Sequence, residues 1–104
     1  MKTDHPQGIT VLVELSGMPE DLDELRELVA GKLVPVTRDY DGCTDLELLT
    51  DLDSETSILV LQRWQSRGHF DRYLDWRRER GDLPRLAELL ERPPTFRFFA
   101  EAAA

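Results

Sequence analysis

The sequence predicts an α+β fold in which one antiparallel sheet and its helices follow the order β-α-β-β-α-(α)-β. Residues 8–15 alternate along the chain with the two-residue period of a strand. Two β-rich runs, residues 45–50 and 56–64, are separated by residues 51–55, which are too polar to continue a strand. Apolar residues at helical spacing follow both the first strand and the last of these runs. At 104 residues the chain is one domain.

The first strand has a clear apolar face formed by every second residue: Ile9, Val11, Val13 and Leu15. Its second face is not fully polar, because Leu12 lies there. Leu59 and Leu61 occupy the same face of the later strand at residues 56–64. A sheet with apolar residues on both faces suits packing against a partner, so we expect a homodimer in which the two sheets face each other.

The first helix follows a turn at residues 16–21. Pro19 suits the first helical turn, and the acidic residues around it suit the positive end of the helix. Residues at three- and four-residue spacing form an amphipathic stripe: Met18, Leu22, Leu25, Leu28, Val29 and Leu33. Gly31 weakens the later turns, and Pro35 predicts that the helix kinks or divides.

The central hairpin is bounded by two residues with local roles. Gly42 can adopt the backbone dihedrals that end a helix sharply. Ser66 is a good N-cap for the helix predicted to start near Arg67. Along the second hairpin strand, Trp64 shares one face with three residues at two-residue spacing: Ile58, Val60 and Gln62.

The last third of the chain completes the fold. The helix from Arg67 carries four residues on one face: Phe70, Tyr73, Leu74 and Arg77. Asp82 is predicted to cap a short helix that ends at residues 92–94 and buries Leu86, Leu89 and Leu90. Because tandem prolines cannot lie in a sheet interior, the last strand is residues 95–100. Residues 1–7 and 101–104 are expected to be flexible ends of a domain spanning residues 8–100. This order of elements is ferredoxin-like.

Composition limits the partners. The chain has 21 acidic and 13 basic residues, a net charge of −8 and a pI of about 4.7. Nucleic acid and anionic membrane are therefore not expected as partners, since both require a positive surface. The one cysteine gives no disulfide framework. No apolar run is long enough for a bilayer or a signal peptide, so a cytoplasmic location is expected.

A known family shares the motifs of the central segment. Residues 37–43 read TR-x-x-x-GC, residues 63–66 read RW-x-S, and Phe70-Asp71 forms an aromatic-acidic pair. This pattern resembles the antibiotic biosynthesis monooxygenase domain family, over roughly residues 8–100. The resemblance implies a ferredoxin-like fold that pairs into a dimeric α+β barrel. It also implies that the first helix continues, bent, to about Asp39. The family includes quinol and anthrone monooxygenases, haem-degrading enzymes and members of unknown role.

The chain departs from the functional patterns of two branches of that family. It contains no asparagine at all. Val60 stands where the anthrone-oxygenating branch has an asparagine, and Phe70 stands where that branch has a pocket tyrosine. The haem-degrading branch needs a first-strand asparagine, a tryptophan where Tyr73 stands and a histidine near Leu83. The resemblance therefore argues against haem degradation and leaves the anthrone-type site to be rebuilt from other residues.

The resemblance implies a pocket between the sheet and the helices, bordered by Trp64. Three residues are candidates for catalytic roles: His69, Tyr73 and Trp64. His69 is the only histidine beyond the N-terminal segment, and the helix start favours its neutral, base-competent form. Tyr73 can offer a phenolic hydrogen bond to a substrate oxygen. The substrate-binding candidates are Ile58, Val60, Gln62, Phe70 and Leu74.

Each candidate also has a purely structural interpretation. Trp64 can be a core aromatic, Tyr73 a half-buried tyrosine with its hydroxyl in water, and His69 an exposed first-turn histidine. Arg38 can pair with a nearby aspartate or approach a substrate anion. Five other polar or reactive residues are interpreted as structural. A solvated helix face would be formed by Arg77, Arg78, Glu79 and Arg80, and Cys43 would be a small buried residue.

Two functions remain open. The first is a cofactor-independent monooxygenase acting on a small electron-rich aromatic, such as a quinol, anthrone or polyketide phenol. The second is a relative on the same scaffold that does not oxygenate: a cyclase, an isomerase or a small-ligand-binding dimer. No metal, haem, flavin or other cofactor is expected, because the sequence has no ligand spacing for a metal and no Gly-rich phosphate loop.

Overall fold

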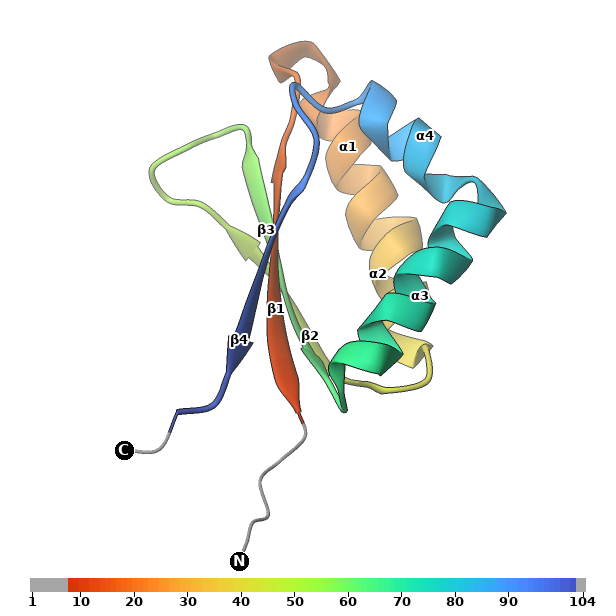
Figure 1. The fold of residues 1–104 in the computed structure, drawn as a ribbon. Coiled ribbons are helices and arrows are strands. Elements are labelled where there is room, and N and C mark those ends of the chain that lie inside the picture. The colour runs from red at the N-terminus through yellow and green to blue at the C-terminus, as the bar shows by residue number, and fades with distance from the viewer. Residues whose placement is uncertain (1–7, 103–104) are drawn as a thin grey trace, which may run out of the picture.

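Four antiparallel strands form one sheet in the computed structural model, which describes residues 8–102. The strands are β1 (Ile9–Ser16), β2 (Cys43–Thr50), β3 (Ser57–Trp64) and β4 (Thr95–Ala100). Their order across the sheet is β2-β3-β1-β4, and the helices pack on one face (Figure 1). The predicted ferredoxin-like α+β fold is confirmed. The ends predicted to be flexible lie outside the described residues, except for residues 101–102.

The register of the strands decides which side chains meet the helices. β1 and β3 pair from Ile9 opposite Trp64 to Ser16 opposite Ser57. Val11 lies opposite Gln62 of β3, and Phe98 of β4 lies on its other side. Because side chains alternate along a strand, this register puts Val11, Gln62 and Phe98 on the helix-covered face. None of the helices formed by residues 8–102 has the length and apolar character of a membrane span.

The first helical segment continues to Asp39, as predicted, and is divided by a change of helix type. It consists of η1 (Pro19–Asp21), α1 (Leu22–Leu28), the π-helical η2 (Val29–Leu33) and α2 (Val34–Asp39). Val34 N–H donates to Val29 O, five residues back. Pro35 has no N–H and its ring crowds the carbonyl four residues earlier, which favours such a widened turn. Of the two outcomes predicted from Pro35, a kink or a division, the structure shows a division, by a π-helical turn just before the proline.

The helix after the hairpin starts and stops at the predicted residues, and the hairpin strands end as predicted but begin at Cys43 and Ser57 rather than at residues 45 and 56. Gly42 has φ +95°, and a Cβ added there would overlap the side chain of His69. Ser66 Oγ accepts a hydrogen bond from His69 N at 3.1 Å and caps α3 (Arg67–Arg80). Gly81, with φ +81°, ends that helix. Both glycines lie in the left-handed region that other residues rarely adopt.

Two predictions about the last helix are wrong. The Asp82 side chain does not cap α4 (Asp82–Glu88), because its carboxylate is bound to two arginines of α3. The helix also ends at Glu88 rather than near the prolines, since Leu90 forms a bridge with Gly17. The predicted buried residues of this segment are confirmed: Leu86, Leu89 and Leu90.

Candidate functional site

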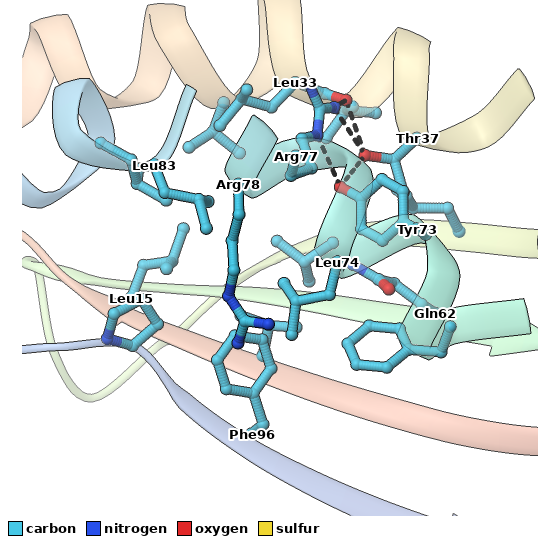
Figure 2. Close-up of a pocket in the computed structure, with 18 of the residues that line it drawn as sticks. Leu15, Leu33, Thr37, Gln62, Tyr73, Leu74, Arg77, Arg78, Leu83 and Phe96 are labelled. Atoms are coloured by element: carbon cyan, nitrogen blue, oxygen red, sulfur yellow. Dashed lines mark hydrogen bonds between the residues drawn. The ribbon is translucent and has the colours of Figure 1, made fainter. Parts of the chain in front are cut away.

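A cavity of about 240 Å³ lies between the sheet and the helices (Figure 2). Its apolar lining comes from every strand and from η2, α2, α3 and α4: Val13, Leu15, Val29, Leu33, Val34, Leu46, Val60, Phe70, Leu74, Leu83, Leu86, Ala87, Pro94 and Phe96. Its polar lining is Thr37, Gln62, Tyr73, Arg77 and Arg78. A mostly apolar cleft with a few polar groups is typical of a small-molecule site.

The mouth of this cavity is marked by the exposed members of its lining, Arg78, Ala87 and Phe96. In Figure 2 the Arg78 side chain extends from α3 toward Phe96 of β4. Phe96 belongs to an edge strand, and more than a third of its surface is exposed. A ligand would therefore enter between the C-terminal half of α3 and β4.

Five of the residues predicted for the site line this cavity: Val60, Gln62, Phe70, Tyr73 and Leu74. Three others do not line it: Ile58, Trp64 and His69. Ile58 and Trp64 share the face of Val60 and Gln62, but they lie toward opposite ends of β3. The structure thus brings together the residues from the middle of β3 and the middle of α3.

Trp64 lies in the core behind the cavity, among the rings of Phe70, Tyr73 and Tyr40. Its indole Nε1 donates a hydrogen bond to Gln62 Oε1 at 2.8 Å. Gln62 is 5% exposed and lines the cavity. Trp64 therefore meets the cavity only through neighbours that line it, and Gln62 is the one to which it is hydrogen-bonded.

His69 lies at the start of α3, against Gly42. Its Nδ1 is 2.7 Å from Ser66 Oγ, and its ring occupies the space that a Cβ at Gly42 would need. The side chain is half-buried but is not part of the cavity lining. A general base must come within hydrogen-bond reach of the proton that it takes, directly or through one water.

The sequence interpretation missed three polar residues of the cavity, Thr37, Arg77 and Arg78, of which Arg77 is the buried charged one. It was predicted to lie on a solvated helix face, but it is only 3% exposed. Its guanidinium donates to Asp82 Oδ2 at 2.7 Å, to Leu33 O at 2.8 Å and to Thr37 Oγ1 at 3.0 Å. The i, i+3, i+4, i+7 stripe of α3 already contained this residue, and that spacing was the signal of its burial.

The Tyr73 hydroxyl is held by the same group of residues rather than by water. The single Thr37 hydroxyl proton goes to Leu33 O at 2.8 Å, so Tyr73 donates to Thr37 Oγ1 at 2.6 Å. Tyr73 in turn accepts from Arg77 Nε at 2.9 Å. Were Thr37 to turn its proton to Tyr73, the Tyr73 proton would be free for a ligand. Leu33 O would keep its bond from Arg77.

Electrostatics keep this cluster charged. Burial alone lowers the pKa of Arg77, but its hydrogen bonds to Tyr73 and Asp82 outweigh burial and leave that pKa raised. Burial likewise raises the pKa of Asp82, yet the bonds from Arg77 and Arg80 outweigh it and leave that pKa lowered. The two side chains therefore remain an ion pair at neutral pH, and Arg77 is part of the cavity lining.

Two further residues considered in the sequence, Arg38 and Cys43, have contacts that fit a structural role. Arg38 donates to Leu46 O at 3.2 Å, and none of the ion pairs found within residues 8–102 involves it. Cys43 is half-buried, and burial raises the pKa of its thiol, which favours the unreactive protonated form. In the described part of the chain, no three His, Cys, Asp or Glu side chains are grouped as metal ligands.

Comparison with known proteins connects this geometry to a family. The sequence model of the family described as antibiotic biosynthesis monooxygenase matches residues 8–77, which is more than half of the chain. That segment runs from β1 to Arg77 in the last turns of α3. Comparison with the sequences of curated proteins gives no significant match.

Solved structures share the fold over almost the whole chain. A conserved protein from Methanosarcina mazei is 21% identical with a TM-score of 0.81, over 91% of this chain and 93% of that chain. Rv0793 from Mycobacterium tuberculosis is 25% identical with a TM-score of 0.73, over 93% and 97%. A monooxygenase from the ActVA-Orf6 gene of Streptomyces coelicolor, solved with nanaomycin D, is 21% identical with a TM-score of 0.74, over 96% and 93%.

Proposed function

The chain belongs to the antibiotic biosynthesis monooxygenase family, and we propose that it is a cofactor-independent monooxygenase. Its substrate would be a small electron-rich aromatic compound, such as a quinol, an anthrone or a polyketide phenol, oxidised with dioxygen. The observation that carries this proposal is the mostly apolar cavity with Gln62, Tyr73 and Arg77 in its walls. The likeness to a Streptomyces coelicolor monooxygenase solved with a small-molecule ligand supports the same choice.

In this chemistry the protein supplies a site and the substrate supplies the electrons. The substrate loses a proton, and its carbanion reduces dioxygen and combines with it. For an anthrone-like ring, a CH₂ group and O₂ become a C=O group and water. The apolar walls, including Val60, Phe70 and Leu74, would hold the planar ring and exclude bulk water.

The proton can be removed without a dedicated base if the cavity stabilises the resulting oxyanion. Among the described residues that line the cavity there is no histidine and no carboxylate. The Arg77 guanidinium would instead provide a positive charge near the ring, and the Tyr73 hydroxyl would donate a hydrogen bond to it once Thr37 turns its own proton to Tyr73. Stabilising the anion lowers the pKa of the bound substrate. Its proton would then pass to water at the mouth, beside Arg78.

We also propose that the protein acts as a homodimer through the sheet face that no helix covers. That face carries Leu12, Leu59 and Leu61, which are half-buried, and the more exposed Leu49 and Phe99. Light scattering on a sizing column should give twice the chain mass of 12.0 kDa. Leu61→Glu should shift the species toward monomer, whereas Leu52→Glu in the exposed hairpin turn should not. A wild-type monomer at micromolar concentration would refute the dimer.

Oxygen uptake tests the proposed activity. A panel of anthrones and hydroquinones is used with EDTA present, and each rate is corrected for autoxidation. Leu74→Trp fills the cavity and should lower the rate by about 10²-fold, because the ring can no longer be placed correctly. Leu52→Trp makes the same change of residue at a site that is 95% exposed, and it should leave the rate unchanged. If no compound exceeds its autoxidation rate, the oxygenase proposal fails.

One observation favours the second function, a ligand-binding or cyclising relative. Val60 and Phe70 line the cavity at the positions where the resemblance implies an asparagine and a tyrosine in the anthrone-oxygenating branch. A cavity without those groups can still bind a planar aromatic ring. Binding of such rings without oxygen uptake would therefore select this alternative.

A further inference from the structure

Gln62 has an amide nitrogen that residues 8–102 leave without a hydrogen-bond partner. The side chain is 95% buried, since 5% of its surface is exposed. No hydrogen bond within residues 8–102 uses its Nε2, whereas its Oε1 accepts from Trp64. In the same part of the chain, every fully buried side-chain nitrogen or oxygen has a partner. The nitrogen must therefore keep accessible surface, and the surface available to Gln62 is the cavity that it lines.

The orientation of this amide is set by Trp64. An indole N–H can only donate, so the amide atom 2.8 Å from it must be the oxygen. Turning the amide over would bring two donors face to face and leave both without an acceptor in the core. Trp64 is itself fixed, being 1% exposed and packed against Phe70 and Tyr73. In Figure 2 the Gln62 amide lies beside Leu74 and Tyr73.

We propose that Trp64 is a positioning residue, which turns the Gln62 amide so that a hydrogen-bond donor of fixed direction faces the cavity. This donor selects a planar aromatic ligand that has an acceptor oxygen, in a carbonyl or a phenolate group, at the position next to the Gln62 amide. A ligand presenting a donor at that point is rejected, because two donors would meet in a site largely screened from water. This inference rests on the proposed function only in one respect, that this cavity binds the ligand. It does not require that the ligand is oxygenated.

Three tricyclic compounds of nearly the same shape test the inference. 9-Fluorenone has only an acceptor, carbazole has only an N–H donor, and fluorene has neither. Dissociation constants are measured by ¹H–¹⁵N NMR titration at pH 8, following the Gln62 side-chain amide and the Trp64 indole. Wild-type protein should bind fluorenone about tenfold more tightly than carbazole, the value of one well-placed hydrogen bond. The Gln62 amide signals should shift with fluorenone and not with fluorene.

Matched variants separate the donor from the packing. Gln62→Glu keeps an oxygen for Trp64 but presents a second oxygen to the cavity, so the preference should reverse in favour of carbazole. Gln65→Glu makes the same change at the exposed residue that directly follows β3, and it should leave the preference for fluorenone unchanged. Trp64→Phe keeps a ring but removes the N–H, so the Gln62 amide can turn over. The ratio of the dissociation constants of carbazole and fluorenone should then fall toward one. Thermal unfolding checks that each variant folds.

The outcomes distinguish this inference from the proposed function. Equal binding of fluorenone and carbazole by wild-type protein, or a preference that survives Gln62→Glu, would overturn it. If none of the three compounds binds, the cavity is not a site for planar rings and the inference fails as well. If the preference is found but oxygen uptake is not, the inference stands and the oxygenase function falls.

Discussion

The two ends of α3 differ in how their polar residues are used. His69, in the first turn, is hydrogen-bonded to Ser66, three residues away, and lies outside the cavity. Arg77, two turns later, is hydrogen-bonded to Leu33, 44 residues away, and lines the cavity. From the sequence, His69 is the candidate base, with an exposed first-turn histidine as the alternative, and Arg77 is expected in water. The chemical type of the side chain suggested His69 as the base. The position of each residue on α3 decides instead that Arg77, and not His69, lines the cavity.

The difference shows that the elements packed against a helix turn decide whether a polar side chain on that turn is buried or exposed. The start of α3 contacts the turn at Gly42, which leaves His69 half-buried beside its own N-cap. One side of the last turns of α3 faces α2 and α4, so a long side chain on that side, such as Arg77, is enclosed and must find partners. Arg77 bonds to residues of η2, α2, α3 and α4, and it links the helical layer in a way that His69 does not.

The largest expected effect is from removing the Arg77 cluster. Arg77→Met should lower the free energy of unfolding by about 2–4 kcal/mol, because charged hydrogen bonds are lost and Thr37 and Tyr73 lose a buried partner. Arg78→Met changes the neighbouring exposed arginine and should have a much smaller effect. Urea unfolding measures both. Equal effects would mean that the two arginines have the same structural role.

The ion pair at this end of the helix should make stability depend on pH. The folded-state pKa of Asp82 is lowered, so its contribution is present above the unfolded pKa of roughly 3.9 and is lost as the pH falls through the folded value. The stability lost in Asp82→Asn should therefore be smaller than for Arg77→Met at pH 7 and shrink in acid. Asp75→Asn breaks an exposed pair with Arg78 and should show little of this dependence. Urea unfolding at several pH values makes the comparison.

At the other end of the helix, the contact with Gly42 can be broken by one methyl group. Gly42→Ala should lower stability by about 1–2 kcal/mol, because the new Cβ strains a positive φ and overlaps His69. Gly81→Ala also strains a positive φ, but a Cβ there meets open space, so its cost should be smaller. In a His69→Gly background, which removes the overlapping Cβ of residue 69 as well as the ring, the difference between the two glycines should disappear. If it persists under thermal unfolding, the overlap is not its cause.

Tyr73 should show a smaller effect than Arg77. Tyr73→Phe keeps the ring against Trp64 and removes only the hydroxyl, so we expect a loss of about 0.5–1.5 kcal/mol. Tyr40→Phe is the matched control, since no hydrogen bond in the described structure uses its hydroxyl. Equal stability of the two variants in urea would show that the bonds to Thr37 and Arg77 contribute nothing.

The smallest expected effect is that of His69 on activity. Removing a true general base costs about 10²- to 10⁴-fold in rate. We expect His69→Ala to show no loss of that size in oxygen uptake, because the ring lies outside the cavity lining. A loss in that range, in a variant that unfolds at the wild-type temperature, would restore His69 as the base and exchange the roles of the two ends of α3.

Much of the fold was readable from local sequence. The alternation of β1, the cap at Ser66, the breaks at Gly42 and Gly81 and the start of β4 after Pro94 all appear where predicted. Each depends on residues within one turn or one strand, whose dihedral preferences and period are properties of the chain itself. The strand and helix periods gave the faces on which Val60, Gln62, Phe70 and Leu74 lie, and the family resemblance implied a pocket between those faces.

Only the tertiary structure decided which polar groups face the cavity. Arg77 is buried because η2, α2 and α4 enclose it, and Asp82 binds that arginine instead of capping its own helix. Trp64 aims the Gln62 amide because β3 places both side chains on the face that α3 covers. These contacts join segments far apart in the chain or depend on packing that fixes a rotamer. The sequence determined the sheet, the helices and their apolar faces by itself, and the packing of the helical layer determined where the charge and hydrogen-bond donors point.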